Sequence, residues 1–438
     1  MSTLSLRGAL VLTLDDRDRI FSPGYVVVRD DRIEEVGPGE GPRGDATVDL
    51  AGRLLMPGLI NAHTHSPMVL FRGLAEGHSL LTLEGWYNAI RAWEEVMDAD
   101  AVPPAVAVSC AEMIRTGTTC FADHYFFMDR ILPIVRQSGL RAALAYGIVE
   151  MGSAAARAAA MREAEAFLES LKDDERLTGW VGPHAFFVDN SPAAIDLELA
   201  LADRYRTGLH IHLSTSGEED QHCLQHYGRT AVQQLRTLGV LDRPVIAAHC
   251  LTIPHEDFPT LAASRFSAVI AASACMRAGA TAAPLRAMRD AGIHTALGTD
   301  NVANNNTYDL FNEMGALGKL MAFREGRPAA VSAREVVEMA TMGGARALGL
   351  ADSIGSLAPG KLADLIALDL DGIGWGPRGG QDVFTALVYA VSGLAVQDVM
   401  VGGEWLLREG RWTTLDYRTA RVQLEQAHAA LRRKRVEG

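Results

Sequence analysis

The fold is decided by residues 54–65, which read LLMPGLINAHTH, an apolar strand-like run that closes on two histidines. Seven comparable runs come later, and most are followed by a stretch with the pattern of a helix, such as residues 153–171. Eight strand-then-helix units predict a parallel sheet, and that number indicates a closed (β/α)8 TIM-like barrel rather than an open sheet. The later runs are TTCFADHY (118–125), RAALAYGIV (141–149), TGWVGPHAFF (178–187), GLHIHLSTS (208–216), RPVIAAHCL (243–251), SAVIAASAC (267–275) and HTALGTD (294–300).

The two ends of the chain have a different texture. Residues 4–52 alternate short β-branched runs with Gly, Pro and Asp turns, which is typical of antiparallel strands. The same pattern returns in residues 355–371 and 399–412. We therefore expect a small β-sandwich built from both ends. The predicted layout is β-sandwich, first part, over 1–56, barrel over 57–352, β-sandwich, second part, over 353–415 and a C-terminal helix over 416–438.

Composition excludes several classes of protein. Hydrophobic residues make up 48% and charged residues 22% of the 438 residues, as in an ordinary globular protein. The formal net charge of −13 disfavours nucleic acid and anionic lipid as partners. No apolar stretch is long enough for a membrane helix, and no signal peptide is apparent at the N-terminus. The five cysteines contain no CxxC pair, which fits a reducing compartment, so we expect a cytoplasmic protein.

The residues that end the apolar runs indicate a metal site. His63 and His65 are two apart on a strand, so their side chains share one face and can meet one ion. This pair alone is a weak signal. Three further runs end in residues of the types that a metal recruits, namely His212, His249 and Asp300. In a barrel, the carboxyl ends of the strands carry the chemistry. Histidines with one carboxylate leave a coordination position for water, as in a catalytic zinc site.

This donor set suggests a reaction. A bound divalent ion lowers the pKa of water to about 7. Asp300 can contact the metal and accept the water's proton, whereas His249 can hydrogen-bond the water or the developing oxyanion. We expect attack on an sp² carbon that bears nitrogen. Zinc is the expected ion, and ferrous iron is the alternative because it also suits nitrogen and oxygen ligands.

Four motifs carry a resemblance that covers nearly the whole chain. The sequence is similar to the amidohydrolase superfamily, in the branch of methylthioadenosine/S-adenosylhomocysteine deaminases and triazine hydrolases. The resemblance implies one divalent metal held by the residues His63, His65, His212 and Asp300, with the water positioned by His249. The run 178–187 lacks the lysine that bridges two metals in other relatives. The four motifs are PGLINAHTHSPMVLFRGLAEG (57–77), HIHL (210–213), AAHC (247–250) and GTDNVANNN (298–306).

Two departures from this branch concern the substrate. Deaminases of the branch carry a glutamate three residues after the histidine that matches His212, and Thr215 stands there. Glu218 or Glu219 could replace it, although both also suit the start of a helix. Residues 272–284, ASACMRAGATAAP, differ from the polar segment of relatives, so we expect a reshaped pocket. Both departures argue against ring deamination of adenine nucleosides and leave the metal set intact.

Three residues are candidate substrate contacts. The likeness implies such a role for His184, Trp86 and Arg141, with a hydrogen-bonded strand end and core packing as the alternatives for the first two. We expect a metal-dependent hydrolase of non-peptide C–N bonds, a deaminase acting on a small nitrogen heterocycle. One alternative is a hydrolase of an aryl urea, carbamate or haloheterocycle, and another is an inactive barrel that serves as a binding or assembly subunit. The expected partners are a small-molecule substrate and a second copy in a homodimer.

Overall fold

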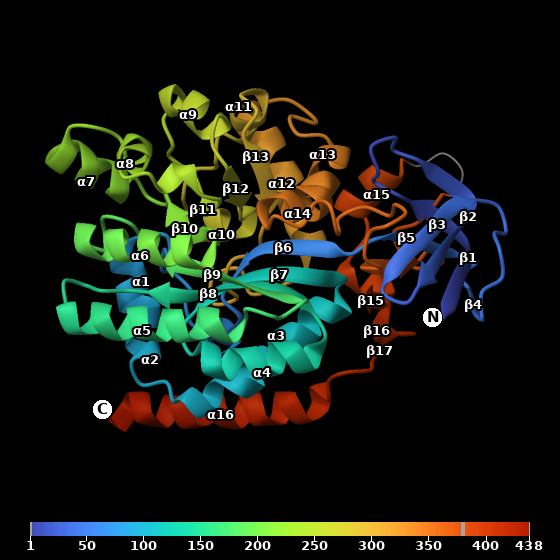
Figure 1. Cartoon of the computed structure of the whole chain (residues 1–438), viewed down its shortest axis with the longest axis horizontal. Helices are drawn as coiled ribbons and strands as arrows, with labels where there is room; N and C mark the ends of the chain where they lie inside the picture. The colour runs from blue at the N-terminus through green and yellow to red at the C-terminus, as the bar shows by residue number, and fades with distance from the viewer. Residues whose placement is uncertain (1, 378–381, 438) are drawn as a thin grey trace.

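The computed structural model describes residues 2–377 and 382–437. Eight parallel strands form one sheet in the order β13-β12-β11-β10-β9-β8-β7-β6 (Figure 1). A bridge between Thr64 and Asp300 brings the first strand to the end of the last, which closes the barrel. The predicted (β/α)8 barrel is therefore confirmed. Its strands are β6 (Leu59–Thr64), β7 (Thr118–Tyr125), β8 (Arg141–Ile148), β9 (Leu177–Pro183), β10 (Leu209–Leu213), β11 (Val245–His249), β12 (Phe266–Ile270) and β13 (His294–Leu297).

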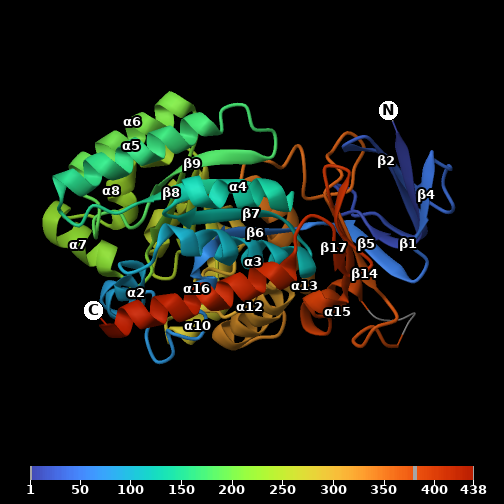
Figure 2. The same cartoon turned by 90° about the horizontal axis from the view of Figure 1, so that it is seen from below.

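Helices alternate with these strands and cover the barrel on the outside (Figures 1 and 2). These strands are covered on both faces, and β7 and β8 are buried along their whole length. Helix α5 forms because its sequence is rich in alanine and because Ser153 Oγ accepts a hydrogen bond from Ala156 N over 3.2 Å.

The α-helices are α1 (Leu83–Trp86), α2 (Ala92–Glu94), α3 (Val102–Arg115), α4 (Met128–Ser138), α5 (Ala154–Ser170), α6 (Pro192–Tyr205), α7 (Glu218–Tyr227), α8 (Ala231–Thr237), α9 (Phe258–Ala262), α10 (Ala272–Arg277), α11 (Leu285–Asp290), α12 (Leu310–Glu325), α13 (Ala333–Glu338), α14 (Gly344–Ala347), α15 (Val383–Tyr389) and α16 (Tyr417–Glu437). The 3-10 and π segments are η1 (Ser66–Phe71), η2 (Tyr87–Arg91), η3 (Ala99–Ala101), η4 (Val240–Asp242), η5 (His255–Asp257), η6 (Met339–Gly343) and η7 (Gly393–Ala395).

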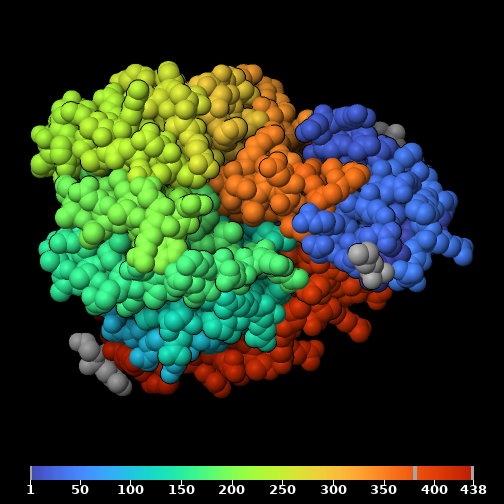
Figure 3. Space-filling view, in the orientation of Figure 1, coloured from blue at the N-terminus to red at the C-terminus, as the bar shows by residue number. Residues whose placement is uncertain are grey.

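A second sheet combines both ends of the chain. Its order is β17-β16-β15-β14-β5-β1-β2-β3, with β4 paired to β1, so the described strands form one continuous mixed sheet. Figure 3 shows the N-terminal strands, in blue, beside C-terminal segments, in red, at one end of the molecule. The strands are β1 (Thr3–Leu12), β2 (Ile20–Arg29), β3 (Arg32–Pro38), β4 (Ala46–Asp49), β5 (Arg53–Pro57), β14 (Leu365–Asp369), β15 (Val396–Val401), β16 (Glu404–Arg408) and β17 (Arg411–Trp412).

The decisive run 54–65 is two strands rather than one. Its first part belongs to β5, which pairs with β14 in the mixed sheet, and its second part is β6 of the barrel. The chain changes sheet at Gly58, where a Cβ atom would lie 2.1 Å from Thr119 Oγ1. At this position only glycine leaves room for the Thr119 side chain of the neighbouring strand. The sequence pattern missed the break because both strands are apolar and buried.

The C-terminal helix α16 runs along α3 beneath the barrel (Figures 1 and 2). His428 on α16 places Nδ1 at 2.8 Å from the carbonyl oxygen of Leu70, in the segment that follows the two histidines of β6. The helix therefore supports the outer side of that segment. Among the described residues, no helix combines the length and the apolarity needed to cross a membrane.

A buried ion pair joins the barrel to the mixed sheet. Arg141 begins β8 and donates from Nε to Asp364 Oδ2 at 2.9 Å and from Nη2 to Oδ1 at 3.2 Å. Their side chains are 5% and 1% exposed. The predicted contact between Arg141 and substrate is wrong, because this residue lies at the amino end of its strand, away from the carboxyl ends that form the barrel mouth.

Replacing Arg141 with methionine should lower the free energy of unfolding by about 3–5 kcal/mol, because Asp364 would stay buried without its counter-ion. Urea unfolding followed by circular dichroism measures this. The matched control is Arg243→Met, since its partner Asp203 has a 59% exposed side chain and exposed pairs contribute at most about 1 kcal/mol. Equal losses in the two variants would contradict the structural role of the buried pair.

Candidate metal-dependent active site

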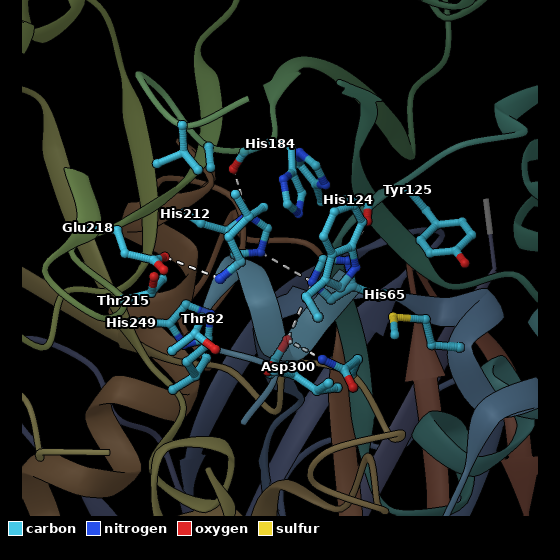
Figure 4. Close-up of a pocket in the computed structure, with 18 of the residues that line it drawn as sticks. His65, Thr82, His124, Tyr125, His184, His212, Thr215, Glu218, His249 and Asp300 are labelled. Carbon is cyan, nitrogen blue, oxygen red and sulfur yellow. Dashed lines mark hydrogen bonds and ion pairs between the residues drawn. The ribbon is translucent and has the colours of Figure 1, made fainter. Parts of the chain in front are cut away.

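Four side chains, three of them labelled in Figure 4, converge at the carboxyl ends of the barrel strands. His63 lies on β6 and His65 directly after it, His212 lies on β10, and Asp300 follows β13. Asp300 Oδ1 lies 3.4 Å from His63 Nε2 and 3.3 Å from His65 Nε2, and the Nε2 atoms of His65 and His212 are 3.4 Å apart. Two groups of three residues share His63. The first adds His65 and His212, and the second adds His249 and Asp300. Within each group the possible ligand atoms all lie within 4.8 Å of one another.

The other ring nitrogens fix how these imidazoles are oriented. His65 Nδ1 is 2.6 Å from the carbonyl oxygen of His124, and His212 Nδ1 is 2.8 Å from that of His184. A carbonyl oxygen only accepts, so each Nδ1 carries the proton and each Nε2 directs a lone pair at the common centre. His63 Nδ1 lies 2.8 Å from His210 Nε2, while its own Nε2 is buried without a hydrogen-bond partner.

Burial controls the charges of this group. It lowers the pKa of His63 to about 3 and holds the pKa of His212 well below its usual value. Burial would raise the pKa of Asp300, but the contacts with His63 and His65 outweigh it and keep that pKa well below normal. His65 shifts the other way: burial acts to lower its pKa, but Asp300 raises it. The centre thus offers imidazole lone pairs and an ionised carboxylate, the ligands that divalent ions such as zinc accept.

The backbone is strained where two strands deliver their side chains. His249, Cys250 and Asp300 all have positive φ, at 77°, 54° and 60°. Non-glycine residues rarely adopt this region, and such strain concentrates at functional sites. Burial lowers the pKa of His249, and its Nδ1 has no hydrogen-bond partner among the described residues. His249 is therefore a neutral imidazole with hydrogen-bonding capacity to spare.

Neighbouring polar groups hold the centre in place. Asn301 Nδ2 donates to Asp300 Oδ1 at 3.0 Å. Asp123 on β7 is buried and accepts hydrogen bonds from Thr64 Oγ1 at 2.7 Å and from Ser66 N at 2.6 Å. These bonds lock the turn that carries His65. The centre thus has a second layer of support, which a random cluster of histidines lacks.

A cavity of about 90 Å³ opens onto these groups. Trp86 and His184, both predicted substrate contacts, line it, with ring centroids 5.1 Å apart. No described residue of 272–284 lines it, so the expectation that this segment reshapes the pocket is wrong. The lining residues are His65, Met68, Leu80, Leu81, Thr82, Leu83, Trp86, Glu94, His124, Tyr125, Phe126, His184, Ala185, Val188, His212, Thr215, Glu218, Glu219, His249, Asp300 and Asn301.

Sequence reasoning placed Trp86 in this wall but missed the other lining residues between 80 and 94. Glu94 on α2 is buried and accepts a hydrogen bond from Tyr125 Oη at 2.8 Å. Leu83 N donates to Glu218 Oε2 at 3.2 Å, which ties this wall to the loop after β10. Nothing in the amino-acid sequence distinguishes Glu94 from a glutamate on the surface, because the adjacent residue Glu95 is also a glutamate and is exposed.

Comparison with known proteins agrees with this architecture. The model of the amidohydrolase family matches residues 54–406. A 5-methylthioadenosine/S-adenosylhomocysteine deaminase from Pelotomaculum thermopropionicum is 34% identical over 99% of both chains, and a 5'-deoxyadenosine deaminase from Methanosarcina acetivorans is 34% identical over 95% of both. The zinc-bound crystal structure of an adenosine deaminase from Xanthomonas campestris superimposes with a TM-score of 0.90 at 28% identity over 98% of both chains. The chain belongs to the amidohydrolase family.

Proposed function

We propose that this protein is a metal-dependent deaminase that hydrolyses an exocyclic C–N bond of an adenine-type heterocycle. The convergence of His63, His65, His212 and Asp300 beneath one cavity is the observation that carries the proposal. The full-length similarity to deaminases of adenine nucleosides supports the substrate class. These relatives make adenine nucleosides the first substrates to test, although reasoning from Thr215 disfavoured them.

The donor set fits one divalent ion. Four donor side chains would hold it. The Nε2 atom of His63 is buried and has no hydrogen-bond partner among the described residues, so its lone pair is available to bind a cation. When bound, such an ion supplies a water molecule acidic enough to act as a nucleophile at neutral pH. Zinc is the proposed ion, because zinc is present in a structural relative and suits these ligands.

The chain's own residues manage the protons. The pKa of Asp300 is held well below normal, so its carboxylate is ionised and can accept the proton of the attacking water. His249 stays neutral and can donate a hydrogen bond to the oxygen that gains charge during attack. Trp86 and His184 present ring surfaces in the cavity wall against which a flat heterocycle can lie.

A proton must also reach the ring nitrogen, and the two candidates for that role, Glu218 and Glu219, have different surroundings. Glu218 Oε2 is already engaged with the backbone of Leu83. Glu219 is buried, lines the same cavity, and its Oε2 has no hydrogen-bond partner among the described residues. Burial raises the pKa of Glu219 to about 7. We propose that Glu219 carries the proton in place of the glutamate that deaminases of the branch have at the position of Thr215.

A second function follows from the same Thr215. Hydrolysis of an aryl urea, carbamate or haloheterocycle needs less proton transfer to a ring nitrogen, so loss of the glutamate favours it. Release of an aniline, alcohol or halide without ammonia would identify this reaction. The third possibility is an inactive barrel that serves as a binding or assembly subunit. The free-energy cost of burying the four predicted ligands and His249 without a metal argues against it.

Three further features remain proposals. We propose a homodimer, which equilibrium ultracentrifugation measures. We propose a cytoplasmic location, which is supported by the described cysteines, all free and buried, since a reducing compartment preserves thiols. We propose zinc over ferrous iron, which elemental analysis of protein purified without oxygen distinguishes.

Removing a metal ligand should remove metal and activity together. The variant His63→Ala loses an imidazole from the centre of the donor group and is expected to bind less than a tenth of the wild-type metal. Asp300→Asn keeps a neutral oxygen ligand but cannot accept the proton, so it should retain part of the metal and lose most turnover. Elemental analysis and ammonia release measure the two effects. Wild-type metal content or activity in His63→Ala would contradict the assignment.

The reaction itself is tested with a panel of substrates. Incubation of the zinc-loaded protein with adenosine, 5'-deoxyadenosine, 5'-methylthioadenosine, a pterin, a pyrimidine and a triazine should release ammonia from at least one purine nucleoside. Glutamate dehydrogenase coupled to the reaction measures the ammonia. Silence across the panel with one full equivalent of metal would sink the proposal.

Replacing Glu219 with glutamine should reduce kcat by about 10²–10⁴-fold, the usual contribution of a positioned acid. Because the protonated form donates, wild-type kcat should fall as the pH rises through about 7, and this inflection should be lost in Glu219→Gln. The matched control is Glu218→Gln, which keeps an oxygen for Leu83 N and should retain most activity. A wild-type pH profile in Glu219→Gln would show that the proton takes another route.

A further inference from the structure

A second cavity adjoins the catalytic one, and together they bear on the charge of the substrate. It measures about 560 Å³ and shares Glu94 and Phe126 with the catalytic cavity. The catalytic cavity measures about 90 Å³, less than the about 150 Å³ of a cavity that holds one benzene, so it has no room for a substituent beside the ring. A substituent on the ring therefore has to extend outward, and the neighbouring cavity is the adjoining space.

The lining of both cavities is acidic. Among the lining residues that the structure describes, the catalytic cavity has no lysine or arginine but contains Glu94, Glu218, Glu219 and Asp300. The neighbouring cavity has Glu94, Glu95, Glu150 and Glu163 and a single arginine, Arg91.

That one arginine is already committed. Arg91 lies 3.8 Å from Glu94 and 3.4 Å from Glu95, as ion pairs. Arg141, a candidate substrate contact in the sequence analysis, forms an ion pair with Asp364 at the amino ends of the barrel strands. Neither guanidinium is free to receive an anion from the substrate.

Glu94 adds an independent observation at the junction. Its side chain is 4% exposed, and its Oε2 has no hydrogen-bond partner among the described residues. A buried acceptor of this kind needs a donor, and the hydroxyl or amino group of a ligand supplies one. A carboxylate or phosphate in the same place would meet like charge without a counter-ion.

We infer that this site selects heterocycles whose substituent is uncharged or cationic and rejects those that carry a carboxylate or phosphate. The inference rests on the proposed deaminase function and narrows it. It separates adenosine, as a substrate, from AMP. Glu163 is the specificity-determining residue best placed to be changed, because it is exposed, lines the neighbouring cavity and contacts Tyr146 Oη rather than the metal centre.

The test compares a matched pair on the zinc-loaded enzyme. Adenosine and AMP differ only in the phosphate, and kcat/KM for AMP should be at least ten-fold lower. Because the effect is electrostatic, the ratio should shrink as salt is raised from 0.02 to 0.5 M. Equal kcat/KM within the pair, or a ratio insensitive to salt, would overturn the inference.

A charge reversal provides the gain of function. Glu163→Arg should raise kcat/KM for AMP several-fold relative to that for adenosine. The control Glu165→Arg makes the same change on α5 at a residue that pairs with Arg204 and lies outside the cavity, so it should alter neither. An unchanged AMP-to-adenosine ratio in Glu163→Arg would count against the inference.

If no nucleoside is turned over, calorimetric titration with adenosine and AMP still measures the affinity of the site for each ligand. Absence of ammonia from every nucleoside would refute the proposed function. Weaker binding of AMP than of adenosine would still support charge selection in that case, and equal binding would refute it.

Discussion

Closure of the barrel between β6 and β13 is the contact on which the site depends. Asn61 Nδ2 donates to Thr299 Oγ1 at 2.8 Å, and Asn61 Oδ1 accepts from Thr299 N at 3.0 Å. Asp300 N then donates to the carbonyl oxygen of His63 at 3.0 Å. These bonds bring residues more than 230 positions apart into adjacent places. Without them, the carboxylate and the first imidazole could not address the same point.

The chemistry at this point is prepared by burial and by strain. Burial lowers the pKa values of His63 and His212 because a charged ring would lose its hydration, and backbone carbonyls orient the rings of His65 and His212. Positive φ at His249 and Asp300 turns these side chains into the barrel mouth at a conformational cost. The rest of the fold repays that cost, with the mixed sheet and α16 holding the barrel from outside.

The space around the centre shapes selectivity. The wall from residues 80–94 arises between β6 and β7, far in sequence from the loop after β10, yet Glu218 joins the two through Leu83. Acidic groups that sit apart in the sequence gather around one cavity and its neighbour. Recognition of the substrate therefore depends on which loops meet over the barrel, whereas the reaction depends on the strand ends.

The sequence by itself determined the barrel and the joining of the chain ends, and it marked polar residues at the strand ends, because hydrophobic periodicity places those ends. It began the barrel at residue 57 but could not show that the chain changes sheet at Gly58, which packs against Thr119. It also did not reveal that Arg141, at the start of its run, pairs with the distant Asp364. Nor could it separate Glu219 from Glu218 or find Glu94: adjacent acids have the same local signal, and burial among distant segments alone gives them different properties.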